Sequence, residues 1–435
     1  MLLFNPVVIS VIVMIVLCLF KLNVLISILI AAMTAGLVSG MSLGGTMNTL
    51  IGGMGGNAET ALSYVLLGAL AVAVNKSGLA SILAKKISKI IGEKKYVFLL
   101  LLAFIGCFSQ NLIPVHIAYI PILIPPLLLL MNKLKIDRRA VACALTFGLK
   151  APYIVLPVGF GLIFHGIISA EMNKSGILIA TSDVAKVLWF PGIGMVIGLF
   201  VAIFFTYRKP REYHDIEVNS LEKFDDENLK MTSKHWFVLI AAISAFVIQV
   251  ITKSLPLGAL GALIIIFVSG AIKFNEIDEL LDGGIKIMGL IAFIMLVASG
   301  YGDVLRKTGA VESLVSSLSI MVNGSKIIGA GLMLLVGLIV TMGIGSSFGT
   351  IPIIAAIYCP LAIELGFSPL ATIVLIGVAA ALGDAGSPAS DSTLGPTSGL
   401  NVDGQHDHIW DTCVPTFLHY NIPLIIFGLI GAMIF

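Results

Sequence analysis

The most constraining feature of this chain is a polar run near its C-terminal end, with the sequence GDAGSPASDST from Gly383 to Thr393. It contains two acids, three serines and a threonine, and its two glycines and one proline would interrupt any helix. The flanking segments Thr372–Leu382 and Val414–Phe435 are apolar enough for membrane helices. Charges inside a bilayer are costly, and irregular backbone there lines a cavity or is buried in protein. The run therefore predicts a place where a polar solute or an ion is held inside the membrane.

The composition predicts an all-α polytopic membrane protein. Of 435 residues, 58% are hydrophobic and only 11% are charged, whereas soluble domains average about a quarter charged. At roughly 20 residues per span, the apolar segments allow about ten to thirteen membrane elements. The first 20 residues lack a basic start and a small-residue cleavage site, so we expect a first membrane helix there. The five cysteines have no metal-ligand spacing, and neither a cofactor nor a nucleic-acid partner is expected.

Three landmarks occur twice in the same order, which predicts two folded halves. The matched pairs are Asn75–Leu79 with Arg306–Ala310, Ser109–Pro114 with Ser347–Pro352, and a helix break at Gly148–Pro152 with one at Gly383–Pro388. After the first landmark, each half contains an amphipathic stretch that suits the membrane interface, at Ser81–Ile91 and Val311–Met321.

Loop charges predict that the two halves are inverted. In the first half, 76–95 and 132–139 carry six and four Lys or Arg, whereas the equivalent loops 306–326 and 361–370 carry three and none. The positive-inside rule then places the first pair in the cytoplasm and the second outside, as in transporters with inverted repeats. Since both basic loops lie on one side, 97–131 must turn back: either as a re-entrant hairpin with its tip at Ser109–Pro114, which we favour, or as two crossings.

These landmarks divide the chain into five predicted parts. They are N-terminal scaffold helices (1–58), a first inverted repeat (59–206), a cytoplasmic linker (207–234), linking scaffold helices (235–285) and a second inverted repeat (286–435).

The two predicted hairpin tips supply oxygen atoms of the kind that hard cations such as sodium prefer. Broken helices also offer free backbone carbonyls and amides. The alternative is that small residues in the tips only let helices pack closely. The predicted binding residues of the tips are Ser109, Gln110 and Asn111 in the first half and Ser346, Ser347 and Thr350 in the second, with sodium near Asn111, Ser347 and Asp384.

Asp384 and Lys150 occupy equivalent places in the two halves, each shortly before a proline. An acid there can bind a cation or exchange it for a proton, and the lysine can replace a cation or hold a carboxylate. Alternatively, the two form a structural pair or extend to the interface. Asp391 is expected as a further partner in the site or as a helix N-cap. The other predicted site residues are Pro152, Gly383, Ser387, Pro388, Ser390 and Thr393. The two histidines of His406–His408 are expected in a solvated loop rather than at a metal.

With these residues in view, the chain resembles the NhaC-type sodium/proton antiporter family of the ion transporter superfamily. The similarity covers most of the chain and is sharpest at Gly383–Thr393, which matches the family's Gly-Asp-x-x-Ser-Pro-x-Ser-Asp-Thr/Ser-Thr run. Ala385 stands where antiporter members often carry Lys, and the block Gly404–Asp411 is similar to a subgroup of histidine-type amino-acid permeases. The resemblance implies inverted repeats, each with a re-entrant hairpin and an unwound helix, elevator-like movement and a scaffold that forms homodimers.

The sequence therefore predicts an ion-coupled secondary transporter of the cell (inner or cytoplasmic) membrane, and not an enzyme. The favoured substrate is an amino acid of the histidine or lysine kind, coupled to Na⁺ or H⁺, because Lys150 and Asp384 complement a carboxylate and an ammonium. The expected partners are thus this small molecule, a monovalent cation and the lipid bilayer. The alternatives are a Na⁺/H⁺ antiporter proper, an intramembrane hydrolase using Asp384 and Asp391, and a channel.

Overall fold

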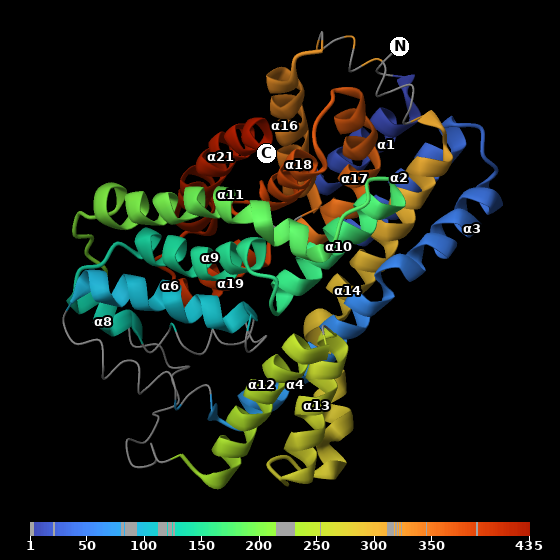
Figure 1. Ribbon diagram of the computed structural model, residues 1–435. Coiled ribbons are helices and arrows are strands. Elements are labelled where there is room, and N and C mark those ends of the chain that lie inside the picture. Colours follow the sequence, from blue (N-terminus) through green and yellow to red (C-terminus); the bar gives the residue numbers. More distant parts are fainter. Residues whose placement is uncertain are drawn as a thin grey trace.

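The computed structural model of the chain is all-helical across the residues it describes, as predicted, with no strand among them (Figure 1). The described residues are 4–20, 22–79, 94–111, 127–214, 231–252, 254–310, 324–344, 346–388 and 390–435, with the isolated positions 82, 120, 124, 317, 320 and 322. The predicted amphipathic stretches Ser81–Ile91 and Val311–Met321 lie outside the described residues, except at 82, 317 and 320. So do 112–126, except at 120 and 124, and residues 215–230 of the predicted linker.

Helices in the first part of the chain begin at capping residues that the sequence supplies. The side chains of Asn23, Ser42 and Asp137 each accept a hydrogen bond from a backbone amide in the first turn of the helix they precede. The helices are α1 (Pro6–Leu19), α2 (Val24–Val38), α3 (Leu43–Met54) with a 3₁₀ turn (Gly55–Asn57), α4 (Ala58–Lys76), α6 (Lys95–Asn111), α8 (Leu128–Lys133), α9 (Arg138–Val155), α10 (Phe160–Lys174) and α11 (Thr181–Val201), which ends in a π-helical turn (Ala202–Thr206).

The second part contains the two helices expected between the halves and then a run of helices around the polar segment. They are α12 (Ser233–Thr252), α13 (Leu255–Val268), a 3₁₀ turn (Phe274–Glu276), α14 (Ile277–Lys307), α16 (Lys326–Ile344), α17 (Ser347–Glu364), α18 (Pro369–Ala381), α19 (Asp391–Leu400), a π-helical turn (His408–Cys413), α20 (Val414–Thr416), a second π-helical turn (Phe417–Asn421) and α21 (Ile422–Ile434).

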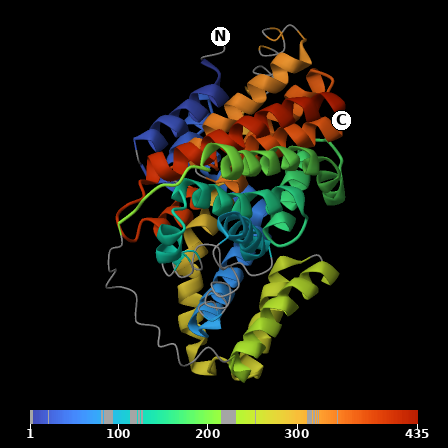
Figure 2. The same ribbon diagram turned by 90° about the vertical axis from the view of Figure 1, so that its left-hand side faces the viewer.

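Several of these helices suit a membrane. By length and composition, four described helices could cross one alone, namely 181–206, 233–252, 347–364 and 408–434, and two bent helix pairs add up to two more. Five shorter apolar helices accompany them. The long α14 packs along α3 and α4, while α12 and α13 project beside α4 (Figures 1 and 2). Helices α9, α17, α18 and α19 surround the polar segment.

The predicted break in the second half is confirmed, but the predicted position of the break in the first half is wrong. In the second half, α18 ends at Ala381 and α19 begins at Asp391. In the first half, α9 continues through Gly148–Pro152 to Val155, and the chain bends by 46° into α10 only afterwards. The proline removes one helical hydrogen bond without ending the helix, because Leu156 N still donates to Pro152 O.

Gly148 has a packing role in place of the predicted breaking role. A Cβ atom at Gly148 would lie 2.5 Å from the Cα of Gly106, so α6 and α9 cross at a glycine pair. The bend itself is at 156–159, where Gly159 adopts φ of +60°.

An ionic cluster fastens the start of α9 to the segment after α19. Arg138 is fully buried, and its guanidinium donates two hydrogen bonds to Asp403, at 2.7 and 2.6 Å, and one to Leu400 O at 3.0 Å. Residues 207–214, which we call the strap, follow the π-helical turn after α11 and attach to the same part of the chain. Arg211 pairs with Asp411 at 2.7 Å. The side chain of Gln405 hydrogen bonds to both the backbone N–H and the C=O of His214.

His406 is buried in this cluster, so the expected solvated loop is wrong at this position. Its ring Nε2 lies 2.7 Å from the Thr412 hydroxyl, and its side chain is 1% exposed. Burial lowers the pKa of His406 to about 4. No group of three or more His, Cys, Asp or Glu side chains that could hold a metal occurs among the described residues.

Candidate functional site

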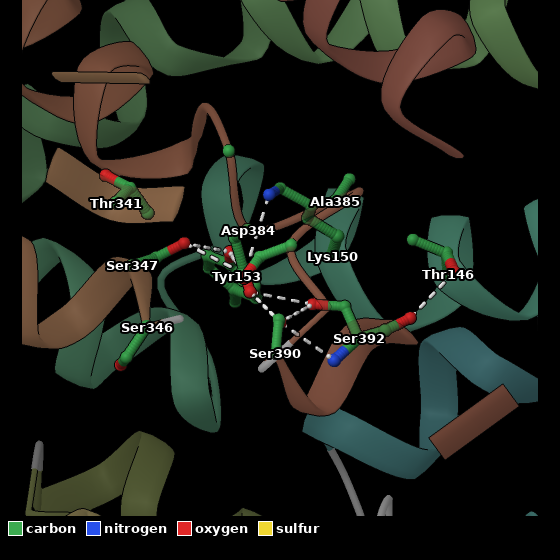
Figure 3. A network of polar contacts seen from close by, with 12 residues as sticks. Thr146, Lys150, Tyr153, Thr341, Ser346, Ser347, Asp384, Ala385, Ser390 and Ser392 are labelled. Atoms are coloured by element: carbon green, nitrogen blue, oxygen red, sulfur yellow. Dashed lines mark hydrogen bonds and ion pairs between the residues drawn. The ribbon is translucent and has the colours of Figure 1, made fainter. Parts of the chain in front are cut away.

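The centre of the polar segment is Asp384, whose carboxylate is buried and fully surrounded by hydrogen-bond donors (Figure 3). Its Oδ2 accepts from the hydroxyls of Tyr153 and Ser347, each at 2.9 Å. Its Oδ1 accepts from Ser390 and, at 2.9 Å, from Ser392. Four hydroxyls from three separate parts of the chain thus converge on one acid, and each stabilises its ionised form.

Lys150 is the positive partner of this acid. Its Nζ lies 3.5 Å from Asp384 Oδ2, and its side chain is fully buried. Among the described residues the ammonium finds no hydrogen-bond acceptor of good geometry, although it has three donors. An incompletely bonded buried charge is costly. Lys150 therefore retains the capacity to bind an acceptor beyond those that the described residues supply.

Two glycines determine the shape of the segment that carries Asp384. Gly383 and Gly386 have φ of +81° and +103°, in the region that side chains rarely adopt. A Cβ atom at Gly386 would lie 2.5 Å from the Cβ of Phe417, and one at Gly383 would lie 2.6 Å from Leu338 O. The chain can thus turn sharply between packed helices, which directs the Asp384 carboxylate inward.

Other polar side chains hold this broken backbone in place. Asn421 accepts from Gly383 N at 3.1 Å and donates to Ala385 O at 2.8 Å. The hydroxyl of Ser387 donates to Met342 O of α16, and that of Thr393 donates to Ser387 O. Backbone groups left free by the break are thereby partnered inside the protein.

Some predicted site residues have local roles. Ser346 caps α17 by accepting from Gly349 N and points away from Asp384, and Thr350 donates to Ser346 O (Figure 3). The N-cap of α19 is Ser390, so the expectation of Asp391 as that cap is wrong. Asp391 is instead the first residue of α19, and its carboxylate makes no hydrogen bond or ion pair to another described residue.

Five further predicted residues make no contact with the acid or have side chains that cannot be placed. Pro152 lies within α9, and Pro388 is exposed and accepts a hydrogen bond from His408 Nε2 through its carbonyl. The side chains of Ser109, Gln110 and Asn111 lie outside the described residues, although their backbone forms the end of α6.

Five buried aromatic rings pack beside the site, and sequence reasoning missed them. They form the aromatic cluster, which comprises Tyr64 of α4, Tyr153 of α9, Phe160 and Phe164 of α10 and Phe348 of α17. Phe348 lies 5.1 Å from the ring of Tyr153 and 6.2 Å from that of Tyr64. The cluster therefore connects the hydroxyl that binds Asp384 with helix α4.

The chain is similar to known membrane proteins over its whole length. Residues 144–429 match the model of the "Na+/H+ antiporter family", and residues 5–91 match that of a "Na+-H+ antiporter family". "Putative amino acid transporter YuiF" of Bacillus subtilis is 50% identical over 441 residues, which cover 99% of this chain and 100% of that protein. "Uncharacterized membrane protein VP2115" of Vibrio parahaemolyticus is 52% identical, with 99% and 100% covered.

Two solved structures share the fold at low sequence identity. The YdaH transporter of Alcanivorax borkumensis has a TM-score of 0.61 and 15% identity, over 89% of this chain and 87% of its own. MtrF of Neisseria gonorrhoeae, from a class of antimetabolite efflux pumps, has a TM-score of 0.60 and 14% identity, over 89% and 83%. Because a family model covers most of the chain and the relatives are half identical from end to end, this membrane protein belongs to the Na⁺/H⁺ antiporter family, in agreement with its resemblance to NhaC-type proteins.

Proposed function

We propose that this secondary transporter is a cation-coupled amino-acid carrier of the cytoplasmic membrane, driven by Na⁺ or H⁺. The observation that supports it best is the pair Lys150 and Asp384. The acid accepts hydrogen bonds from four hydroxyls, whereas the ammonium 3.5 Å away has no acceptor of good geometry in the described part of the chain. An α-amino acid carries a carboxylate, which is the acceptor that a buried ammonium requires.

The same pair suggests how cation and substrate are coupled. While Lys150 neutralises Asp384, the pair has no net charge. A sodium ion or a proton on Asp384 would take over this neutralisation, with the hydroxyls of Ser347 and Ser390 as further oxygen ligands for sodium. Lys150 would then be free to bind the substrate carboxylate. Each ligand would thereby increase the affinity for the other, as reciprocal linkage requires.

Asp391 adds a negative charge near this pair. It lies seven residues from Asp384, at the start of the helix that also carries Ser392. Its carboxylate has no hydrogen bond or ion pair to a described residue, so it can bind the ammonium of an amino acid or a second cation. The name of the Bacillus subtilis relative, an amino acid transporter, supports this choice of substrate.

A Na⁺/H⁺ antiporter proper is the second candidate, and the family match favours it. In that case Lys150 acts as an internal replacement for the cation, and Asp384 alternates between sodium and a proton. Inverted repeats, elevator-like movement of the broken helices and a homodimeric scaffold are part of the proposal in either case, on the basis of the family resemblance and the loop charges.

Uptake into liposomes distinguishes the two candidates. We expect the purified full chain to accumulate radiolabelled histidine or lysine when an inward sodium or proton gradient is imposed. Equimolar potassium inside and outside serves as the control without a gradient. Robust sodium-driven proton flux without uptake of any amino acid would contradict the carrier and establish the antiporter.

Cysteine labelling tests the proposed inversion of the two halves. We expect Lys133→Cys, in a basic loop, to react with an impermeant thiol reagent only from the cytoplasmic side. Glu364→Cys, in the equivalent loop without Lys or Arg, should react only from outside. Both residues are exposed, and the native cysteines would first be replaced. Labelling of both from one face would exclude the inverted arrangement.

A further inference from the structure

A second bent membrane segment lies in the N-terminal part of the chain. Residues 43–57 and 61–74 are apolar enough to form one span together, and their axes differ by 52°. Glu59, in the first turn of α4, lies at the bend between them, and its side chain is exposed. An ionisable residue inside a membrane segment is a candidate for function, because its burial in lipid is costly.

A cavity of about 290 Å³ lies beside this bend, between it and α10. The polar side chains of Asn57, Glu59, Ser63 and Thr181 line it. Gly166 of α10 forms part of the opposite wall, and a Cβ atom placed there would meet no other atom within 4 Å. We call this cavity, lined by Asn57, Glu59, Ser63, Gly166 and Thr181, the Glu59 pocket. It has room for a ligand beside Gly166.

The polar groups of the Glu59 pocket leave oxygen atoms available to a ligand. Asn57 uses its amide nitrogen to bond Met295 O at 3.2 Å, which leaves its side-chain carbonyl free among the described residues. Ser63 donates to the backbone carbonyl of Glu59 and can still accept. The Glu59 carboxylate has no hydrogen bond or ion pair with another described residue.

Nearby cations are already neutralised. Lys174 packs against Gly56 at the edge of the pocket, but its ammonium pairs with Glu171 at 2.7 Å. Arg306 bonds the other oxygen of Glu171 and also Asp303. These four side chains have no net charge, so Glu59 gives the pocket one negative charge that no described cation compensates.

We propose that the Glu59 pocket is a second binding site, for a monovalent cation: either sodium with part of its water shell or the ammonium end of an amino acid. The volume is far larger than a bare ion, and the lining offers a carboxylate, an amide carbonyl and hydroxyls. Tyr64, directly after Ser63 on α4, belongs to the aromatic cluster, so the pocket lies next to the rings that separate α4 from Asp384. The Glu59 site itself does not depend on a role for Asp384, and only the total of two sodium sites expected below rests on the proposed function.

Equilibrium binding of radiolabelled sodium to the purified full chain tests this proposal. We expect two sodium sites in the wild type, one in Glu59→Gln and one in Asp384→Asn. Glu364→Gln, which removes an exposed acid remote in sequence from the pocket, should retain both. In a second arm, radiolabelled lysine is tested on Asp384→Asn with and without Glu59→Gln, and binding that depends on Glu59 identifies an ammonium site. Wild-type binding by Glu59→Gln in both arms would overturn the proposal.

Filling the pocket provides a test that leaves the acid in place. Glu59 is in the first turn of α4, where a carboxylate also stabilises the helix dipole, so its removal affects folding as well. We expect Gly166→Leu to weaken binding at this site at least tenfold. Gly52→Leu, on α3, is the matched control, because a Cβ atom there also meets nothing within 4 Å. Unchanged binding in Gly166→Leu, or equal loss in Gly52→Leu, would refute the site.

Discussion

Asp384→Asn is expected to abolish cation-coupled uptake while leaving the chain folded. The change is nearly isosteric, but it removes the charge that four hydroxyls and Lys150 surround. The part of the stabilisation by sodium that comes from binding at Asp384 should be lost together with transport. In the wild type, free sodium at 100 times the dissociation constant of one site adds about 2.7 kcal/mol to the free energy of unfolding. A thermal melt with and without sodium, beside liposome uptake, measures both effects.

A double variant controls for the effect of leaving Lys150 without its counter-ion. With Asp384 neutralised, the Lys150 ammonium loses its counter-ion, and breaking a buried pair typically costs about 3–5 kcal/mol. The double variant Asp384→Asn with Lys150→Met removes both charges and should recover part of that stability, yet remain inactive. Wild-type uptake and wild-type sodium stabilisation in the single variant would show that Asp384 has only a structural role.

Lys150→Met is expected to weaken amino-acid binding by about ten- to a hundredfold. Charge-assisted hydrogen bonds from an ammonium to a carboxylate contribute roughly 1.5–3 kcal/mol each, and about 1.4 kcal/mol is a factor of ten in affinity. In an antiporter, the same variant would change the pH profile of sodium/proton exchange and reveal no organic substrate. Binding of radiolabelled histidine and lysine, measured beside sodium-driven proton flux, separates the two cases.

Lys186→Met is the matched control for this substitution. Lys186 is exposed at the start of α11 and pairs only with Asp183 among the described residues. Its loss should leave binding within twofold of the wild type. Equal binding of amino acids by Lys150→Met and Lys186→Met would contradict a role of Lys150 in holding the carboxylate.

The sequence predicts the polar break well because its residues act locally. Two glycines and a proline within a few residues prevent a helix wherever they occur, so 382–390 could be identified without tertiary information. The break after α9 was harder to place. Pro152 suggests an interruption, but a single proline in a packed helix is tolerated, and the bend depends on Gly159 further along.

Some partners of Asp384 could be predicted from the sequence, whereas the residues around them depend on tertiary packing. Ser390 and Ser392 follow it closely in sequence, and Lys150 was singled out by the predicted match between the two halves. Tyr153 could have been found, since it lies three residues after Lys150 and hence on the same helical face. The aromatic cluster could not, because its rings come from four helices that only tertiary packing brings together.

The strap over the Arg138–Asp403 cluster has a mechanical consequence. Because 207–214 is bonded to Gln405 and Asp411, the chain leaving α11 is attached to the segment that follows α19. Any displacement of the broken helix must therefore either carry this part of the connector with it or first release three polar attachments. Removing the side chains of Arg211 and Gln405 would break all three attachments and so uncouple the chain leaving α11 from the segment that follows α19.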